Sequence, residues 1–437
     1  MNSHAAVKEQ AETHLLEAAK EFQKCMQCGK CRSVCPVFKE LGNEIYVARG
    51  KNKLAEKLVS GDLQITSRIK EAINECLNCK TCSTNCPAGV SPEHVVLRLR
   101  WYITTQEGLG FFKALIFRQL LWRKWPITLA AMLGAVAQRA LFGIGPKNPV
   151  RHLFPLFGFS KRRFFPQMAL RSAQSRHPEV TPAKTARSTD KRGRVGYFTG
   201  CAGNLIYTGV VDATVDILTA YGYEVVIPKA QKCNGTPVLA NGDYEGAKRL
   251  MQHNFDTFQA YDLDAIVVAC SSCGMALKKE IKLFVEQSEE LQRFTAKVFD
   301  INEFIDQNLA IKPEELGPLP YRVSYHDPCH MVRGQKISAE PRRLLQQIPG
   351  IEFKEMRDAA VCCGSAGSYC LTHYSTAIAI NNHKVRNIQE AEVDFVATAC
   401  PTCVMHIQDN LLQHGSPEKV RFVVEILADS LRAAKTL

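Results

Sequence analysis

Cysteine is the residue type in this chain with the greatest capacity for chemistry, since 18 of the 437 residues are cysteine. Eight of them form two short runs near the N-terminus, which read Cys25-x2-Cys28-x2-Cys31-x3-Cys35-Pro36 and Cys76-x2-Cys79-x2-Cys82-x3-Cys86-Pro87. Three cysteines on one tight turn can reach three iron atoms of a cubane cluster, and a fourth thiolate completes the set. The two runs therefore predict two [4Fe–4S] clusters.

The spacing of both runs is that of bacterial ferredoxins, in which the fourth cysteine of each run binds the other cluster. We therefore assign one cluster to Cys25, Cys28, Cys31 and Cys86, and the other to Cys76, Cys79, Cys82 and Cys35. The alternative is zinc, which takes a single tetrahedron of four ligands and fits a gapless run of this kind poorly. The proline after each run is expected to stop the turn from continuing as a helix.

A second set of cysteines forms an internal repeat. In the first copy 31 residues separate Cys201 from Cys233, and a further 36 precede the pair Cys270-x2-Cys273. In the second copy the corresponding cysteines are Cys329, Cys362, Cys363, Cys400 and Cys403. The first copy has Asn234 where the second has the latter cysteine of its doublet. Such closely matched spacing indicates a duplicated structural unit.

Short apolar runs in the second half alternate with helical patterns. Strands are predicted at residues 194–199, 224–227, 265–269, 322–326 and 395–399, and helices at 210–221, 244–258 and 375–390. Buried strands that alternate with helices favour mostly parallel sheets. Each CxxC pair directly follows a strand and should begin a helix, whose N-terminus favours a thiolate. Gly235, Gly364 and Gly367 should let the backbone approach a bound group closely.

The N-terminal part is expected to be helical, because Leu15, Leu16, Ala19 and Phe22 recur at helical spacing within residues 1–24. The predicted fold class is α+β and multidomain, with a mostly helical ferredoxin-type domain followed by two α/β repeats. The predicted boundaries are 1–100 for the two-cluster domain, 101–193 for a basic, aromatic-rich segment, 194–320 for the first repeat and 321–437 for the second.

Charge is concentrated in one segment. The formal net charge is +12, and residues 113–194 hold 17 Lys and Arg against two acids, so the rest of the chain sums to about −3. This basic segment could meet anionic lipid or an acidic partner, or it could be a solvated linker. Its apolar stretch at residues 126–137 is too short to span a bilayer, and Trp122 and Trp125 suit an interface. No nucleic-acid-recognition fold accompanies it, so nucleic acid is not an expected partner.

Two ferredoxin-type runs followed by two CCG repeats resemble the iron–sulfur subunits of glycolate oxidase and of anaerobic glycerol-3-phosphate dehydrogenase. The CCG repeat itself is similar to that of heterodisulfide reductase. The resemblance implies an oxidoreductase subunit that transfers electrons while a separate FAD-containing subunit oxidises the substrate. It also implies a noncubane [4Fe–4S] cluster at Cys329, Cys362, Cys363, Cys400 and Cys403.

The first repeat departs from this pattern, because Asn234 leaves only Cys201, Cys233, Cys270 and Cys273. Four thiolates can bind zinc or a simpler cluster, and a vacant, packed thiol group is the alternative. His326 and His330, which flank Cys329, are expected to hydrogen-bond to backbone or to cluster sulfur rather than to ligate metal. Cys370 lies outside the repeat pattern and is expected to pack in the core.

The favoured function is electron transfer within an FAD-linked dehydrogenase of a 2-hydroxy acid such as glycolate or lactate, toward quinone or another acceptor. The alternatives are the same role for sn-glycerol 3-phosphate, or a heterodisulfide-reductase-like catalytic subunit. A charged N-terminus without an apolar signal region predicts a cytoplasmic chain with reduced cysteines. The basic segment adds the expectation of a peripheral position on the inner face of the cell membrane, and a membrane subunit is a further candidate partner.

Overall fold

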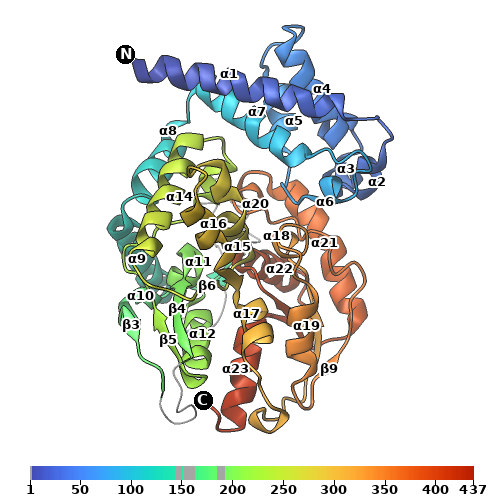
Figure 1. The fold of residues 1–437 in the computed structure, drawn as a ribbon. Coiled ribbons are helices and arrows are strands. Elements are labelled where there is room, and N and C mark those ends of the chain that lie inside the picture. The colour runs from blue at the N-terminus through green and yellow to red at the C-terminus, as the bar shows by residue number, and fades with distance from the viewer. Residues whose placement is uncertain (1, 143–149, 152–162, 185–191) are drawn as a thin grey trace. The chain divides into compact units, whose positions relative to one another are not determined.

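The structure is a computed structural model, and it describes all residues except 1, 143–149, 152–162 and 185–191 (Figure 1). The chain divides into two compact units, each built from segments that lie far apart in the sequence. Unit 1 comprises residues 1–119, 235–248 and 364–380. Unit 2 comprises residues 120–234, 249–363 and 381–437. A part of each repeat therefore belongs to the unit that contains the two ferredoxin-type runs.

Unit 1 is helical. Its first segment contains α1 (Asn2–Gln23), α2 (Lys30–Val34), α3 (Pro36–Leu41), η1 (Glu44–Tyr46), α4 (Ala48–Val59), α5 (Ser67–Asn74), α6 (Thr81–Thr84), α7 (Pro92–Glu107), α8 (Phe111–Ala114) and most of the π-helical turn η2 (Leu115–Leu120). The two later segments add α13 (Thr236–Leu239), the start of α14 (Tyr244–Gln259), α20 (Tyr369–Thr372) and the start of α21 (Tyr374–Ala391).

An apolar core joins α1, α4, α5 and α7. Leu15, Ile73, Val95 and Leu99 are among its buried side chains. The predicted N-terminal helix is confirmed, and of its four predicted apolar residues Leu15 is buried, Ala19 and Phe22 are half-buried, and Leu16 alone is exposed. Leu16 is 51% exposed, because the core-facing positions of α1 are occupied by residues such as Leu15 and Ala18.

The later segments of unit 1 pack on α7 and on the loop that precedes the second cysteine run. The rings of Trp101 and Tyr244 stack with centroids 4.0 Å apart. Asn241 Nδ2 donates to Ser368 Oγ at 2.8 Å, which joins the two repeat-derived segments to each other. Tyr369 donates its hydroxyl hydrogen to Glu75, the residue immediately before Cys76.

Unit 2 contains both sheets. The five-stranded sheet has the order β3-β5-β4-β6-β7, with β3 (Val180–Thr181), β4 (Gly193–Phe198), β5 (Tyr223–Val226), β6 (Ala265–Val268) and β7 (Val298–Asp300). The four-stranded sheet has the order β11-β10-β8-β9, with β8 (Arg322–Tyr325), β9 (Glu352–Phe353), β10 (Phe395–Thr398) and β11 (Lys419–Phe422). All neighbouring strands in both sheets are parallel except the pair β3 and β5.

Two of the described helices of unit 2 precede the strands of both sheets, and the others alternate with them or follow them. The helices of this unit are α9 (Lys124–Phe142), α10 (Ala173–Arg176), α11 (Gly200–Leu205), α12 (Thr208–Ala220), the rest of α14, α15 (Ser271–Lys278), η3 (Glu280–Leu283), α16 (Glu289–Ala296), α17 (Ile301–Asn308), η4 (Pro313–Glu315), α18 (Cys329–Val332), α19 (Ala339–Gln346), the rest of α21, α22 (Pro401–Gln413) and α23 (Val423–Ala433). A further antiparallel pair is formed by β1 (Val150–Arg151) and β2 (Phe164–Phe165).

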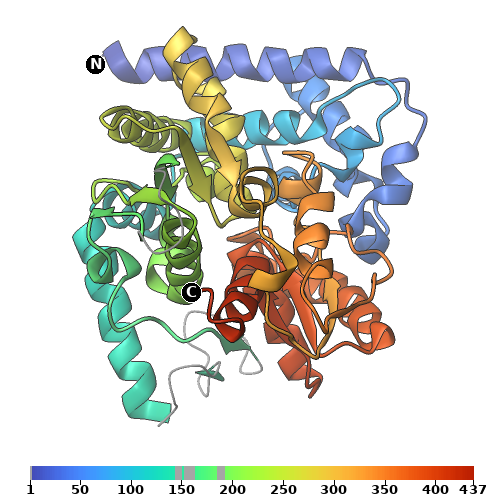
Figure 2. The same cartoon turned by 60° about the horizontal axis from the view of Figure 1, so that its bottom comes forward.

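The sheets confirm the duplication that the cysteine spacing predicts. The order β5-β4-β6-β7 in the first sheet corresponds to β9-β8-β10-β11 in the second. In both repeats a cysteine-bearing helix follows the first strand, and a CxxC helix follows the third strand. The strands and helices that the second repeat contributes to unit 2 are coloured orange to red and lie together in Figure 2. The five predicted strands are confirmed, whereas β3, β7, β9 and β11 were not predicted.

Candidate iron–sulfur sites

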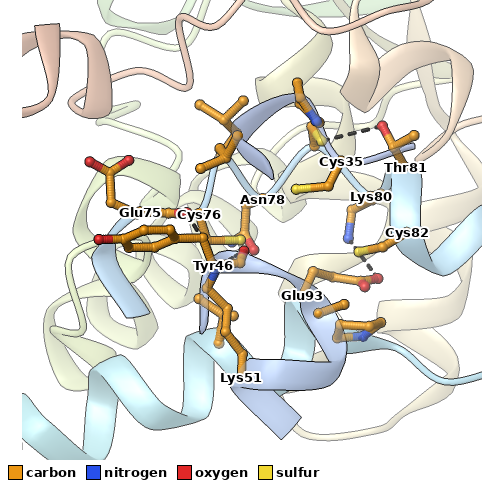
Figure 3. Close-up of a pocket in the computed structure, with 17 residues that line it drawn as sticks. Cys35, Tyr46, Lys51, Glu75, Cys76, Asn78, Lys80, Thr81, Cys82 and Glu93 are labelled. Atoms are coloured by element: carbon orange, nitrogen blue, oxygen red, sulfur yellow. Dashed lines mark hydrogen bonds and ion pairs between the residues drawn. The ribbon is translucent and has the colours of Figure 1, made fainter. Parts of the chain in front are cut away.

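The first ferredoxin-type cavity encloses about 460 Å³ within unit 1. Its lining includes all four cysteines of one predicted cluster, Cys35, Cys76, Cys79 and Cys82. Figure 3 shows the sulfur atoms of Cys35, Cys76 and Cys82 directed into the same space. Four thiols from two runs thus surround one hollow, which is the donor set that a cubane cluster requires.

The second cavity encloses about 400 Å³, also within unit 1. It is lined by the other predicted set, Cys25, Cys28, Cys31 and Cys86, together with Cys82. The final cysteine of each run therefore faces the cavity formed mainly by the other run. The third cysteine of each run lies in a short helix, α2 or α6, and the fourth follows that helix, which carries it away from the first three.

Both runs use the same backbone conformation. Gln27 and Asn78, which precede the second cysteine of each run, have φ values of 55° and 53°. Gly29 and Lys80, which follow it, have φ values of 79° and 60°. Left-handed residues on both sides of the second cysteine tighten the turn enough to bring three thiols together. Pro36, which follows the first run, is also the first residue of the next helix, α3.

Burial makes these thiols poor acids without a cation. It raises the pKa of Cys35 to about 11 and that of Cys82 well above its usual value. A buried thiolate needs nearby positive charge, which iron supplies in a cluster. Arg49 lies beside the other cavity, where its side chain donates to Glu44 at 2.8 Å and to the Gln27 carbonyl at 3.4 Å. Arg49 therefore supports the first cysteine loop, a contact that the sequence did not predict.

The second repeat collects buried thiols at the carboxyl end of β10. Cys363 Sγ lies 3.4 Å from Cys403 Sγ, and with His326 they form a group whose potential ligand atoms all lie within 4.8 Å of one another. Cys400 directly precedes α22, which begins at the CxxC pair as predicted, and its thiol contacts Cys403. Of the five predicted ligands, Cys329, Cys362 and Cys400 stand outside the 4.8 Å group among the described residues.

The imidazole of His326 is fixed by its Nδ1 atom, which lies 3.1 Å from the Ala359 carbonyl oxygen. The expected backbone hydrogen bond is therefore confirmed. Burial lowers the pKa of His326 to about 3, so the ring is neutral at ordinary pH. Its Nε2 atom has no hydrogen-bond partner in the described structure. Because a carbonyl oxygen can only accept, Nδ1 carries the single proton of the neutral ring. The Nε2 atom therefore has a lone pair, with which it can accept from a thiol or serve as a metal ligand.

The CxxC pairs of the two repeats meet within unit 2. The thiols of Cys270 and Cys400 are hydrogen-bonded, and the Ser271 amide donates to the Ala399 carbonyl at 3.1 Å. Gln335 Nε2 also donates to the Ser271 carbonyl at 2.9 Å. Hydrogen bonds from Cys270 and Cys403 hold the pKa of Cys400 well below its usual value. Nothing in the sequence revealed this contact, because it depends on how the two sheets pack.

The first repeat holds its cysteines differently. Cys201 is exposed and Cys233 is buried, and both line a cavity of about 430 Å³. Cys270 caps α15, and Cys273 Sγ lies 3.1 Å from the place that a Cβ atom on Gly200 would occupy. These four thiols do not form a group within 4.8 Å among the described residues. Asn234 is buried, and its side-chain oxygen accepts from the Cys233 thiol at 3.8 Å.

Cys370 packs in the core, as expected. It is fully buried, and its sulfur lies 3.2 Å from the Gly367 carbonyl oxygen. The three glycines expected to allow a close backbone approach have a left-handed backbone, with φ values of 86° at Gly235, 85° at Gly364 and 63° at Gly367. The two repeats therefore share the same sharp turn after the doublet position, although one of them lacks the second cysteine.

Comparisons with known proteins agree with this organisation. Residues 195–278 and 323–408 match the Cysteine-rich domain (CCG), and residues 21–90 match the 4Fe-4S dicluster domain. Lactate utilization protein A of Geobacillus thermodenitrificans is 32% identical over 238 residues, which cover 54% of this chain and 98% of that protein. The chain belongs to the CCG iron–sulfur subunit family.

Two longer relatives match nearly the whole chain. The Probable glycolate oxidase iron-sulfur subunit of Bacillus subtilis is 28% identical, with 95% of this chain and 94% of that protein covered. A fumarate reductase (CoM/CoB) subunit of Methanothermobacter marburgensis is also 28% identical, with 93% of this chain and 72% of that protein covered. This CCG protein is therefore an iron–sulfur subunit of an oxidoreductase with partner subunits.

Proposed function

We propose that this subunit carries electrons from an FAD-containing partner that oxidises a 2-hydroxy acid, with glycolate or lactate as the substrate class. The observation that carries the electron-transfer role is the pair of unit 1 cavities, each lined by one complete set of four thiols. When bound there, two [4Fe–4S] clusters would supply one-electron carriers. The glycolate and lactate relatives support the substrate class.

The path of the electrons beyond unit 1 is proposed from the order of the residues along the chain. Tyr369, which donates to Glu75 beside Cys76, lies six residues after Cys363 of the second CCG site. We therefore assign the exchange of electrons with the second CCG site to the cavity of Cys76, rather than to that of Cys25. The noncubane cluster is proposed for Cys329, Cys362, Cys363, Cys400 and Cys403. Zinc or a simpler cluster is proposed for Cys201, Cys233, Cys270 and Cys273.

The decisive experiment uses the neighbouring subunit. An affinity-tagged full chain, purified anaerobically, should retain an FAD protein, and glycolate or lactate should reduce first the flavin and then the clusters. Reduction by sn-glycerol 3-phosphate instead would replace the proposed substrate. A colourless chain without iron or acid-labile sulfide would overturn the electron-transfer role itself.

Crossed ligation is tested separately by Cys35→Ser and Cys86→Ser. If the assignment is right, Cys35→Ser alters the EPR signal of the cluster held by Cys76, Cys79 and Cys82. Cys86→Ser alters the signal of the other cluster. Loss of the cluster nearest in sequence to each substitution would contradict the assignment. Cys370→Ser is the matched control, since Cys370 lies outside both cavities.

A position against the cytoplasmic face of the membrane is proposed from α9. None of the described helices has the length and apolar character needed to span a bilayer. Five apolar side chains nevertheless project from one face of α9, with exposed fractions of 68% for Trp125, 45% for Leu129, 41% for Met132, 61% for Leu133 and 55% for Val136. Their helical spacing, together with the excess of 15 positive charges at residues 113–194, fits an anionic lipid surface.

Vesicle flotation tests this surface. The full chain should float with anionic vesicles at low salt and should bind neutral vesicles less well, and Leu133→Glu should reduce flotation strongly. Leu283→Glu is the control, because Leu283 is also exposed in unit 2 but lies on η3. Equal flotation of both variants would remove the lipid assignment and favour a membrane subunit as the partner of α9.

A heterodisulfide-reductase-like catalytic role is the second candidate. It is supported by the similarity to the fumarate reductase (CoM/CoB) chain and by the contact between Cys270 and Cys400. Reduction of a disulfide by the isolated, cluster-loaded chain with a viologen donor would favour this role. Electron acceptance without disulfide reduction would favour the carrier role.

A further inference from the structure

A buried cation lies beside the cavity of Cys76 without a carboxylate partner. Arg100 on α7 is 8% exposed. Among the described residues, its guanidinium donates only to backbone carbonyl oxygens, at 3.2 Å to Ile73, 3.0 Å to Asn74, 2.9 Å to Cys76 and 2.9 Å to Ala240. Its Nε atom has no hydrogen-bond partner in the described structure.

A second buried cation approaches the same cavity from α4. Lys51 is 2% exposed, and its ammonium group donates to the Tyr46 carbonyl and, at 3.3 Å, to the Glu75 carbonyl. Lys51 lines the cavity and favours the thiolate form of Cys35, while the charge of Arg100 interacts with Cys76. The two cations therefore act on two different ligands of one predicted cluster.

Burying two such charges is costly unless an anion compensates them. The C-terminus of α5, where Arg100 meets the carbonyls of Ile73 and Asn74, supplies only a partial negative charge. The Glu75 carboxylate accepts hydrogen bonds from Tyr369 and Thr376 and forms no ion pair with either cation. The cavity is also lined by the Glu93 carboxylate, but that group pairs with a third buried cation, Lys80, at 3.4 Å. Among the described residues that line the cavity, the four thiolates are therefore the negative charge left for Arg100 and Lys51.

The other cavity is arranged differently. Its neighbouring cation, Arg49, is 31% exposed and forms an ion pair with Glu44 at 2.8 Å. Glu44 also pairs with Arg32 at 2.6 Å, and all three side chains reach solvent. Exposed and paired charges are screened, so they affect a neighbouring redox group much less than buried, carboxylate-free cations do.

We propose that Arg100 and Lys51 are counter-cations that raise the reduction potential of the cluster held by Cys35, Cys76, Cys79 and Cys82. Gain of one electron adds one negative charge to the thiolate-bound group, and no bond forms or breaks. Nearby buried positive charge stabilises that reduced state and favours the arrival of the electron at this cavity. The inference rests on the proposed function, because it requires a cluster at this site.

The alternative is that Arg100 serves only as a cap for the C-terminus of α5. Charge and geometry separate the two roles. Arg100→Lys retains the positive charge but loses the forked hydrogen bonds, whereas Arg100→Gln retains some hydrogen bonding and loses the charge. Arg98→Gln is the control, because Arg98 lies on the same helix, is 27% exposed and pairs with Glu17 at 3.0 Å.

The test is an EPR-monitored redox titration of the anaerobic full chain, with iron and sulfide counted in each sample. Arg100→Gln should shift the reduction equilibrium of this cluster at least tenfold toward the oxidised form, which is about 59 mV for one electron. Arg100→Lys should stay close to the wild type, and Arg98→Gln should match it. The potential of the other cluster should change much less in every variant.

The inference fails if fully loaded Arg100→Gln keeps the wild-type potential, or if Arg100→Lys shifts it as far as Arg100→Gln does. If Arg100→Gln does not retain iron, Lys51→Gln decides by the same criterion. Absence of iron from the wild-type chain would instead overturn the proposed function. The iron count thus separates failure of the electron-transfer role from failure of the potential assignment.

Discussion

The turn after the second cysteine doublet should tolerate no side chain at Gly364. Its φ value is +85°, and a Cβ atom there would lie 2.6 Å from the Ala377 carbonyl oxygen and 3.2 Å from Ile380 Cβ. The first neighbour is backbone, so it cannot rotate away. Gly367, three residues later, has a φ value of +63° but no atom within 4 Å of its Cβ position. Substitution of Gly367 therefore tests backbone strain alone, whereas substitution of Gly364 tests backbone strain together with steric overlap.

The expected energies follow from that difference. An alanine in the left-handed region costs about 1–2 kcal/mol, and this cost applies to both Gly364→Ala and Gly367→Ala. Overpacking adds about 1–3 kcal/mol, and this applies only at Gly364. For a unit of the size of unit 1, 1 kcal/mol corresponds to about 2–4 °C in melting temperature. Gly364→Ala should thus melt about 2–12 °C below Gly367→Ala.

Differential scanning calorimetry of the anaerobically purified full chains measures this difference. Iron content gives a second measurement, because Gly364 directly follows Cys363 and its displacement should weaken cluster retention at the second CCG site. Equal melting temperatures and equal iron contents for the two variants would refute the steric reasoning. A lower melting temperature for Gly367→Ala would show that the turn is not the one described.

Three further changes have definite expected outcomes. Arg163→Ala removes the cation that lies 3.7 Å from the buried Asp409 carboxylate. The free energy of unfolding, measured in denaturant melts, should therefore fall by about 3–5 kcal/mol. The double variant Arg163→Met with Asp409→Leu should recover most of that loss. Burial raises the pKa of Asp300 from 3.8 to about 7. The folded state therefore holds this proton more tightly than the unfolded chain does, and the free energy of unfolding of the wild type should fall as the pH rises from about 4 to 7. Asp300→Asn should remove that decline when melting temperatures are compared across this pH range. Asn234→Cys restores the doublet next to Cys233, and an increase in iron per chain with a new EPR signal is expected.

The sequence was sufficient to predict the elements that follow local patterns. The cysteine runs predicted the thiol sets of both unit 1 cavities, because a short loop with fixed spacing leaves little freedom in where its thiols lie. The strands before each CxxC pair were predicted correctly, since they are short, apolar and followed by a helix start. The short strand β9 was missed because its two residues, Glu352 and Phe353, carry almost no apolar pattern.

Features that depend on distant packing were not predictable. Arg100 sits in an otherwise ordinary helical pattern, and only the structure reveals that its guanidinium is buried against the carbonyls around Cys76. The grouping of residues 235–248 and 364–380 with unit 1 is equally invisible in the sequence. The sequence places His326 near Cys329, but its proximity to Cys363 and Cys403 depends on strand register.

The first repeat makes the same turn as the second although it has one cysteine fewer, and unit 1 gives a reason. Gly235 has nearly the same left-handed backbone as Gly364, so the chain makes the same turn after Asn234 as after Cys363. The segment that follows supplies the Ala240 carbonyl to Arg100 and the Asn241 amide to Ser368. These contacts use backbone and side-chain groups beyond the doublet, so they do not need a second cysteine. The turn is therefore required to hold the surroundings of Cys76 whether or not the first repeat binds metal.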